Sequence, residues 1–155
     1  MTIIAQESFI EIYPELLPLF ESHWRELGPY KDKMPLSPSL ESYSFLEAHG
    51  QLLTLTARQE GRLVGYIICA VRTGLHYSTT LQAITDIPYV APSVRGRGVG
   101  VRLFLAAQEE LKARKVGPWF ASYKINSPLA PSMDKLLHWL GMKPADVQFS
   151  KWLDD

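Results

Sequence analysis

The chain has 155 residues, of which 46% are hydrophobic and 21% are charged, values close to the average of globular proteins. Such a length can bury a core that needs neither disulfides nor metal, so we expect a single domain over residues 1–155. The 16 basic and 16 acidic side chains balance, which argues against a nucleic-acid partner. The single cysteine, Cys69, excludes an internal disulfide and a cysteine-based metal cluster, and we expect no metal.

No targeting pattern stands out in the sequence. The first residues lack the basic segment and long apolar run of a secretory signal. The apolar runs elsewhere are shorter than the roughly 18–20 residues that a bilayer requires. We therefore expect a cytoplasmic protein with no membrane partner.

Hydrophobic spacing, together with glycine and proline breaks, predicts alternating strands and helices. In chain order the predicted elements are strand Ile3–Ala5, helices Tyr13–Leu27 and Ser39–Ala48, strands Gln51–Ala57, Leu63–Val71 and Leu81–Val90, helix Gly98–Lys115, strand Trp119–Ile125, helix Pro131–Leu140 and strand Val147–Leu153. The order indicates an α+β or α/β sandwich. Its sheet begins largely antiparallel, and a crossover helix follows the fourth strand.

The segment after the fourth predicted strand has the features of an anion-binding site. It contains three alternate glycines, Gly96, Gly98 and Gly100, directly before a helix. Glycines allow successive backbone N–H groups to point to one side, and a helix start adds unpaired N–H groups and partial positive charge. Three arginines surround this loop, at positions 95, 97 and 102. The loop therefore suits a phosphate, although neither the Walker nor the Rossmann glycine pattern is present.

Arg95, Gly98 and Gly100 fill the defining positions of an R/Q-x-x-G-x-G/A signature. Here the chain resembles the GNAT superfamily of acetyl-CoA-dependent N-acetyltransferases. The corner Leu137–Met142 is similar to the end of the family's last helix. The resemblance implies an α+β fold, with a mixed, mostly antiparallel sheet of about six to seven strands flanked by about four helices. It also implies acetyl-CoA as cosubstrate and a possible homodimer.

The resemblance assigns the cosubstrate-binding residues. The backbone of Tyr89 and Val90 would pair with the pantetheine arm, an N–H near Val90 would polarise the thioester, and Asn126 resembles an asparagine that contacts the arm. The pyrophosphate would be held by the backbone N–H groups of Arg95, Gly96, Arg97, Gly98, Val99, Gly100 and Val101.

The catalytic groups are less clearly marked. Asp86 lies on the fourth strand where family members carry a carboxylate base, and strict alternation points its side chain to the side of Pro88 and Val90. His76, His23 and Glu26 are reserves for the base. Leu137 occupies the position of the family's usual tyrosine acid. Tyr123 or His138 would replace that acid, or no acid is required. Asp86 and Tyr123 also fit purely structural roles.

The acceptor is not legible in the sequence. We expect a primary amine of a small molecule or a protein. The acidic first third, with eight acids and three bases in residues 1–50, favours a cationic amine such as a lysine side chain, a protein N-terminus or a polyamine. Two alternatives stay open: a non-catalytic acyl-CoA-binding or regulatory module, and a nucleotide- or phosphate-binding domain of unrelated fold.

Overall fold

The computed structural model describes residues 1–153, and the chain divides into two compact units. The first unit is Met1–Ser122, and the second begins at Tyr123. In its described residues, 123–153, the second unit contains one helix, α4 (Ala130–Trp139). The first unit contains β1 (Thr2–Gln6), α1 (Phe9–Leu27), α2 (Leu40–Ala48), β2 (Leu52–Gln59), β3 (Arg62–Gly74), β4 (Tyr77–Val90), the 3-10 helix η1 (Pro92–Val94), α3 (Val99–Ala113) and β5 (Trp119–Phe120).

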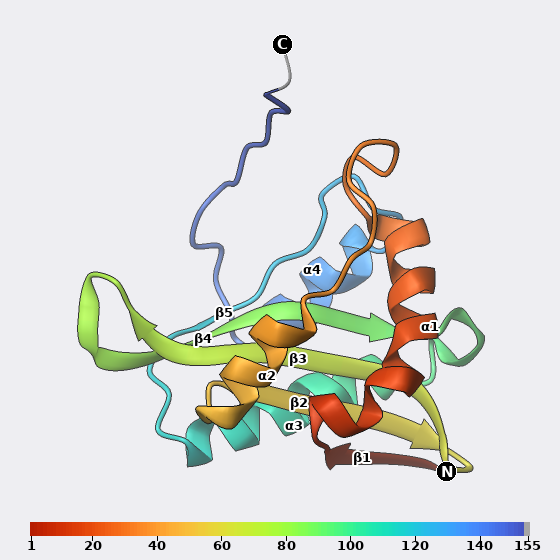
Figure 1. The fold of residues 1–155 in the computed structure, drawn as a ribbon, viewed down its shortest axis with the longest axis horizontal. Helices are drawn as coiled ribbons and strands as arrows, with labels where there is room; N and C mark the ends of the chain where they lie inside the picture. The colour runs from red at the N-terminus through yellow and green to blue at the C-terminus, as the bar shows by residue number, and fades with distance from the viewer. Residues whose placement is uncertain (154–155) are drawn as a thin grey trace. The chain divides into compact units, whose positions relative to one another are not determined.

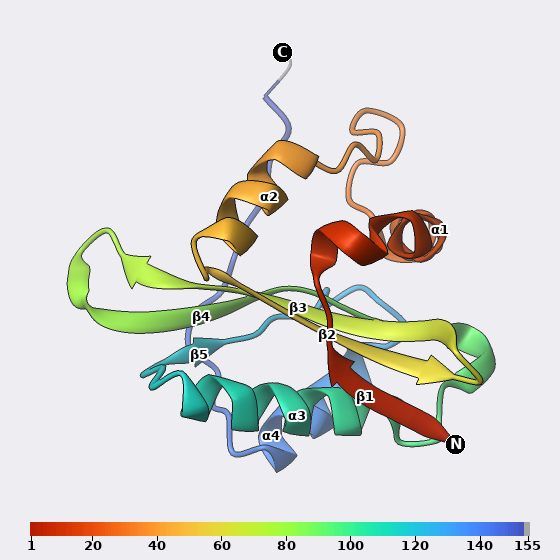
Figure 2. The same cartoon turned by 60° about the horizontal axis from the view of Figure 1, so that its bottom comes forward.

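The first unit is a sheet with helices on both faces. Its strand order is β1-β2-β3-β4-β5; the first four strands are antiparallel, and β4 pairs with β5 in parallel. Helices α1 and α2 cover one face, and α3 covers the other (Figures 1 and 2). This arrangement confirms the expected α+β fold with a mostly antiparallel sheet.

Each helix layer buries an apolar stripe against the sheet. Leu103, Phe104, Ala107 and Leu111 form the buried stripe of α3, at the i, i+4, i+8 spacing of one helix face. On the opposite side, a core cluster joins α1 to the strands; its buried members are Phe9, Ile12, Leu16, Phe20, Leu52, Tyr66, Ile68 and Tyr89. Burial of these side chains fixes the helices on the sheet.

Helix α1 starts four residues before its predicted start at Tyr13. Ser8 is the N-cap and accepts a hydrogen bond from the N–H of Glu11. Glu47 on α2 accepts a second bond, at 2.6 Å, from the N–H of Phe9. The extra turn is therefore stabilised by a partner from the next helix, which the local pattern does not reveal.

Within residues 1–153 the sheet has five strands rather than six to seven. β5 ends at Phe120 instead of Ile125, and the segment Val147–Leu153 forms no strand. Val147, Phe149 and Leu153 are 79%, 89% and 84% exposed. Alternation of side chains favours an extended segment, but a strand exists only through hydrogen bonds to a neighbour. No such pairing involves this segment in the described part of the chain.

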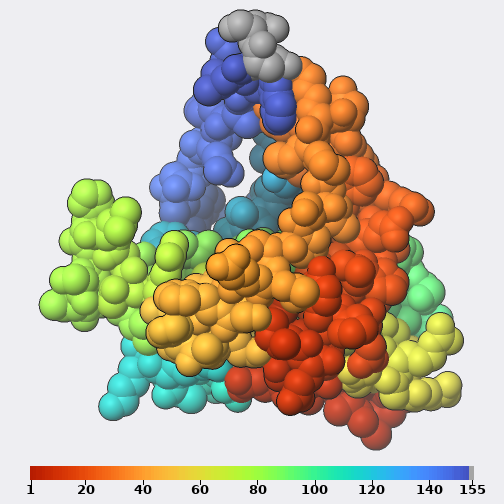
Figure 3. Space-filling model, viewed as in Figure 1, coloured from red at the N-terminus to blue at the C-terminus, as the bar shows by residue number. Residues whose placement is uncertain are grey.

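Strands β3 and β4 are longer than predicted. β3 continues to Gly74, whereas its predicted end is Val71. β4 begins at Tyr77, whereas its predicted start is Leu81. The resulting hairpin stands out from the rest of the first unit, beside α2 (Figure 3). Its tip is solvated, since Leu75 is 101% and Tyr77 is 64% exposed. The prediction missed it because the tip has no buried apolar alternation.

Candidate active site

The glycine loop between β4 and α3 has an open, N–H-rich surface. Gly96 and Gly98 have φ angles of 76° and 79°, the left-handed region that favours glycine. A Cβ built on either residue would have nothing within 4 Å. Helix α3 begins at Val99 with no side chain capping its first N–H groups. A phosphate group fits this loop, because it would find bare backbone donors at the positive end of a helix.

The Arg95 side chain binds other residues of the protein. Its Nη1 and Nη2 atoms donate to the two carboxylate oxygens of Glu26 at 2.6 and 2.8 Å, and its Nε donates to the carbonyl of Val90 at 2.8 Å. The guanidinium lies 5.3 Å from the ring centroid of Tyr89. The Arg95 hydrogen bond lowers the pKa of Glu26 below its usual 4.5, against the effect of partial burial. Arg95 therefore ties the loop to α1 and to the end of β4.

The other loop arginines differ from Arg95. Arg97 and Arg102 are exposed, and neither has an ion pair with any residue that the structure describes. Val99 is buried, and Gly100 and Val101 are half-buried at the start of α3. The positive charge available to a ligand at this loop therefore comes from Arg97, Arg102 and the helix itself.

The end of β4 presents backbone groups along an open edge. β4 pairs with β5 only at Ala83 and Ile84 and then continues to Val90. Ala91 donates its N–H to Val64 of β3, so antiparallel alternation turns the N–H of Val90 to the opposite, open side. The same alternation turns the N–H of Tyr89 toward β3. The outward donor for an extended arm is therefore Val90.

Asp86 lies in a β-bulge of β4. Ile68 pairs with Ile87 and Cys69 pairs with Thr85, so Asp86 is an extra residue between two ladder pairs. The bulge breaks the alternation. Asp86 faces α2, on the same side of the sheet as Ile87, which is partly buried against the core cluster. Val90 is on the opposite side, toward α3: its Cγ2 lies 3.8 Å from a Cβ built on Gly100. The expected orientation of Asp86 with Pro88 and Val90 is wrong.

Tyr43 of α2 holds the Asp86 carboxylate. Its hydroxyl donates to Oδ2 of Asp86 at 2.8 Å. Burial and the nearby Asp86 charge raise the pKa of Tyr43, so the hydroxyl keeps its proton and remains a donor. Sequence reasoning missed Tyr43, because nothing local marks which helix residue faces a strand residue 43 positions away.

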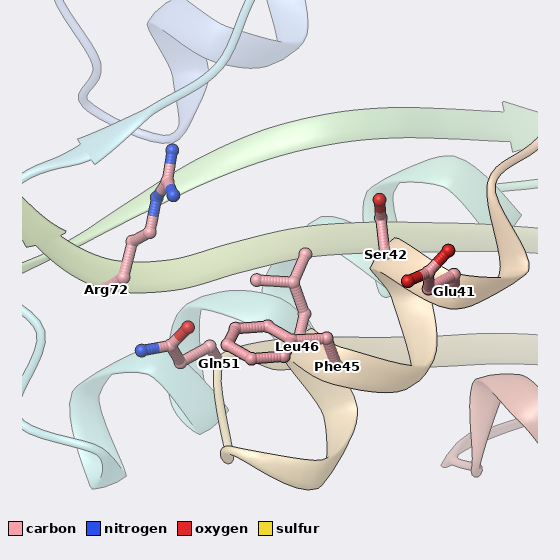
Figure 4. Close-up of a pocket in the computed structure, with 6 residues that line it drawn as sticks. All are labelled: Glu41, Ser42, Phe45, Leu46, Gln51 and Arg72. Atoms are coloured by element: carbon pink, nitrogen blue, oxygen red, sulfur yellow. The ribbon is translucent and has the colours of Figure 1, made fainter.

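Two cavities lie between α2 and the strands. One, of about 260 Å³, is lined by Ser42, Tyr43, Leu46, Leu52, Ala70, Arg72, Ile84 and Asp86. The other, of about 420 Å³, is lined by Glu41, Ser42, Phe45, Leu46, Gln51 and Arg72 (Figure 4). The two cavities are neighbours that share the lining residues Ser42, Leu46 and Arg72, and we call them together the α2 groove. Asp86 lies at one end of it.

The reserve candidates take different places. His23 stacks on Tyr89, with ring centroids 4.8 Å apart, and its Nδ1 lies 3.1 Å from the Tyr66 hydroxyl. Glu26 is paired with Arg95. His76 lies between β3 and β4 at the exposed hairpin tip. None of these three residues lines either cavity of the α2 groove.

The second unit holds the remaining candidates. Tyr123 donates its hydroxyl to Oδ1 of Asp134 at 2.7 Å, which raises the pKa of the tyrosine. Asn126 is exposed in a turn before α4. Leu137, at the position of the family's usual tyrosine, is 8% exposed on α4. His138 pairs through Nδ1 with the Asp134 backbone carbonyl at 2.9 Å.

Among residues 1–153, no group of three or more His, Cys, Asp or Glu side chains is placed to hold a metal ion. Within the same range, no helix is both long and apolar enough to cross a membrane.

The fold is similar to that of known acetyltransferases. The family model of the acetyltransferase (GNAT) family matches residues 10–128. Among solved structures, an aminoglycoside acetyltransferase from an uncultured soil metagenomic sample has 18% identity and a TM-score of 0.77, with 99% of each chain covered. A ribosomal-protein-alanine N-acetyltransferase from Brucella melitensis biovar Abortus 2308 has 20% identity and a TM-score of 0.69, covering 100% of this chain and 99% of that one.

A third structure is AAC(6')-Iy in complex with the bisubstrate analogue CoA-S-monomethyl-acetylneamine. It has 20% identity and a TM-score of 0.66, with 99% of each chain covered. No curated protein sequence gives a significant match. The structural likenesses establish the fold, and the family model covers most of the chain. The chain belongs to the GNAT acetyltransferase family and is an acyltransferase enzyme, in a family that uses acetyl-CoA.

Proposed function

We propose that this enzyme transfers the acetyl group of acetyl-CoA to a primary amine bound in the α2 groove. The observation that carries the proposal is the arrangement of β4. The strand carries a tyrosine-held carboxylate, Asp86, and leads directly into the open glycine loop. A single strand would thus serve the acceptor amine and the phosphates of the cosubstrate.

The cosubstrate is proposed to lie along the edge of β4 and over the loop. The backbone N–H groups of residues 96–101 would bind its pyrophosphate, since Gly96 and Gly98 leave the loop surface bare. The N–H of Arg95, which the resemblance also assigns to the pyrophosphate, donates to the carbonyl of Pro92 at 3.3 Å instead. The outward N–H of Val90 would bind the extended arm or the acyl oxygen. Arg95 would hold the loop in shape through Glu26 and Val90. Asn126 stays a proposed contact to the arm.

Asp86 is proposed as the general base. Acetyl-CoA supplies an acyl carbon activated as a thioester, with a thiolate as leaving group. An ammonium has no lone pair, so Asp86 would remove one proton from the acceptor, directly or through water. The nitrogen–carbon bond then forms as the carbon–sulfur bond breaks, and the nitrogen loses its second proton. Tyr43 would hold the Asp86 carboxylate toward the groove.

Tyr123 is the proposed acid for the leaving thiolate, because Leu137 offers no proton. The raised pKa of Tyr123 keeps its hydroxyl protonated at neutral pH. The second proton of the amine would reach solvent while Tyr123 protonates the sulfur.

The cytoplasmic location and the homodimer stay predictions.

The test is release of coenzyme A, followed with a thiol reagent over a panel of primary amines. We expect turnover with at least one amine, loss of turnover in Asp86→Asn, and normal turnover in the exposed control Asp32→Asn. Calorimetry would show tight coenzyme A binding and weak binding of ATP and NAD. Tight coenzyme A binding without turnover for any amine would instead favour a regulatory acyl-CoA-binding module. Preference for ATP or NAD would contradict the proposal.

A further inference from the structure

The α2 groove carries charges of both signs. Asp86 is at one end, and Arg72 of β3 lines both cavities that make up the groove. Arg72 is exposed and has no ion pair with any residue in the described range 1–153. An acceptor that carries positive charge only would meet the Asp86 carboxylate but would be repelled by this guanidinium. The groove is therefore not built for a polycation alone.

Glu41 is the other charged residue of the groove. It lies at the far end of the larger cavity from Arg72, with Ser42 and Leu46 between them (Figure 4). Since the two side chains form no ion pair, Glu41 does not neutralise the guanidinium at close range. Arg72 is thus left with its donors available to a ligand, and a guanidinium binds carboxylate or phosphate in a two-pronged manner.

The spacing of Arg72 and Asp86 limits the size of the acceptor. Arg72 pairs with Gln82 on β4, and Asp86 follows four residues later. At about 3.3 Å per strand residue, the two positions are about 13 Å apart along the strand. Both residues line the 260 Å³ cavity. The distance of about 13 Å is a spacing of backbone positions, and the bulge at Asp86 shortens it slightly, so a small molecule with a charged group at each end is long enough to lie between the two side chains.

The walls between the two charges are apolar. Leu46, Leu52, Ala70 and Ile84 line the same cavity, and Ile84 is 48% exposed. An acceptor whose central part is a hydrocarbon or aromatic body would cover these side chains. A freely hydrated sugar ring would leave them without an apolar contact.

We infer that the acceptor is a small amine that also carries a carboxylate or phosphate, and that Arg72 binds this anionic group while Asp86 faces the amine. The inference rests on the proposed function and deepens it. It makes Arg72 a specificity-determining residue, since it selects the acceptor without taking part in proton transfer. It also disfavours acceptors whose second polar group is another amine.

The test compares four amines that share one aromatic body. They are para-(aminomethyl)benzoate, para-(aminomethyl)phenyl phosphate, the neutral para-(aminomethyl)benzamide and para-xylylenediamine. Binding of each to the coenzyme A complex is measured by calorimetry, and acetyl transfer is measured separately. The variants are Arg72→Gln and the matched control Arg62→Gln, an exposed arginine of the same strand outside the groove.

We expect the carboxylate or the phosphate to bind at least tenfold more tightly than the amide and the diamine, a difference of about 1.4 kcal/mol. Arg72→Gln should remove this preference, and Arg62→Gln should keep it. The carboxylate and phosphate arms identify which anion is used. Equal or tighter binding of the amide or the diamine, or an unchanged preference in Arg72→Gln, would overturn the inference. Because binding is read without turnover, a lack of acetyl transfer would count against the proposed function alone.

Discussion

The guanidinium of Arg95 and the carboxylate of Glu26 form a two-pronged ion pair, with nitrogen–oxygen distances of 2.6 and 2.8 Å. The pair joins the first residue of the glycine loop to the last turn of α1. Both side chains are largely shielded, with 24% and 29% exposure. The geometry of the loop therefore depends on α1, a helix far from the loop in the sequence.

Replacement of Arg95 with Met should destabilise the protein by about 1–3 kcal/mol, because Glu26 and the Val90 carbonyl lose charge-assisted hydrogen bonds. Chemical denaturation measures the loss. The exposed control Arg97→Met should change the free energy of unfolding by less than about 0.5 kcal/mol. A double-mutant cycle with Glu26→Gln should give a coupling energy of about 0.5–3 kcal/mol. Additive effects would show that the ion pair contributes nothing of its own.

Acid should weaken the same ion pair. The pKa of Glu26 lies below its usual 4.5 because Arg95 stabilises the charged form. A lowered pKa means that the contribution to stability is complete above pH 4.5 and is lost as the pH falls through the lowered pKa. The difference in Tm between wild type and Glu26→Gln should therefore shrink on acidification. Glu7 and Glu15 also have lowered pKa values, but both proteins share them. A constant difference down to about pH 3 would contradict the prediction.

Gly98→Asp should abolish coenzyme A binding, because it places a side chain and a negative charge on the bare loop. Gly50→Asp is the matched control: both glycines have positive φ, 79° and 66°, and neither would have anything within 4 Å of a Cβ. Both variants should pay a backbone cost of roughly 1–2 kcal/mol. Calorimetry should show normal coenzyme A affinity for Gly50→Asp only. Normal affinity in Gly98→Asp would place the phosphates elsewhere.

Asp86→Asn should lower kcat by about 10²- to 10⁴-fold if the carboxylate is the base. Tyr43→Phe removes one hydrogen bond to that carboxylate, so kcat should fall roughly tenfold, with the KM for acetyl-CoA unchanged. Tyr77→Phe is the control, since Tyr77 is exposed at the tip of the β3–β4 hairpin, away from Asp86. A loss of stability in Tyr43→Phe without any change in kcat would make Tyr43 a packing residue only.

Tyr123→Phe tests the acid. We expect kcat to fall at least about tenfold, because the leaving sulfur would lose its proton donor. His138→Gln, which alters another group beside Asp134, should leave kcat unchanged. Unchanged kcat in Tyr123→Phe would mean that the thiolate leaves without an acid from this position.

The family, the fold class and the position of the glycine loop could be predicted from the sequence because each depends on local patterns. The loop needs glycines where φ is positive, and Gly96 and Gly98 stand there. The predicted helices and the first four strands exist, with shifted ends. Hydrophobic spacing within a segment was enough for them, since each buries one face.

The role of particular side chains was decided by tertiary structure alone. Asp86 changes side because the β3–β4 register inserts one extra residue, and register is a property of two strands. Arg95 looks like a phosphate ligand by position, but Glu26, 69 residues away, takes its guanidinium. Tyr43 and Arg72 join the site only because α2 lies over the sheet. A sequence encodes backbone preference residue by residue, whereas a partner is set by how distant segments pack.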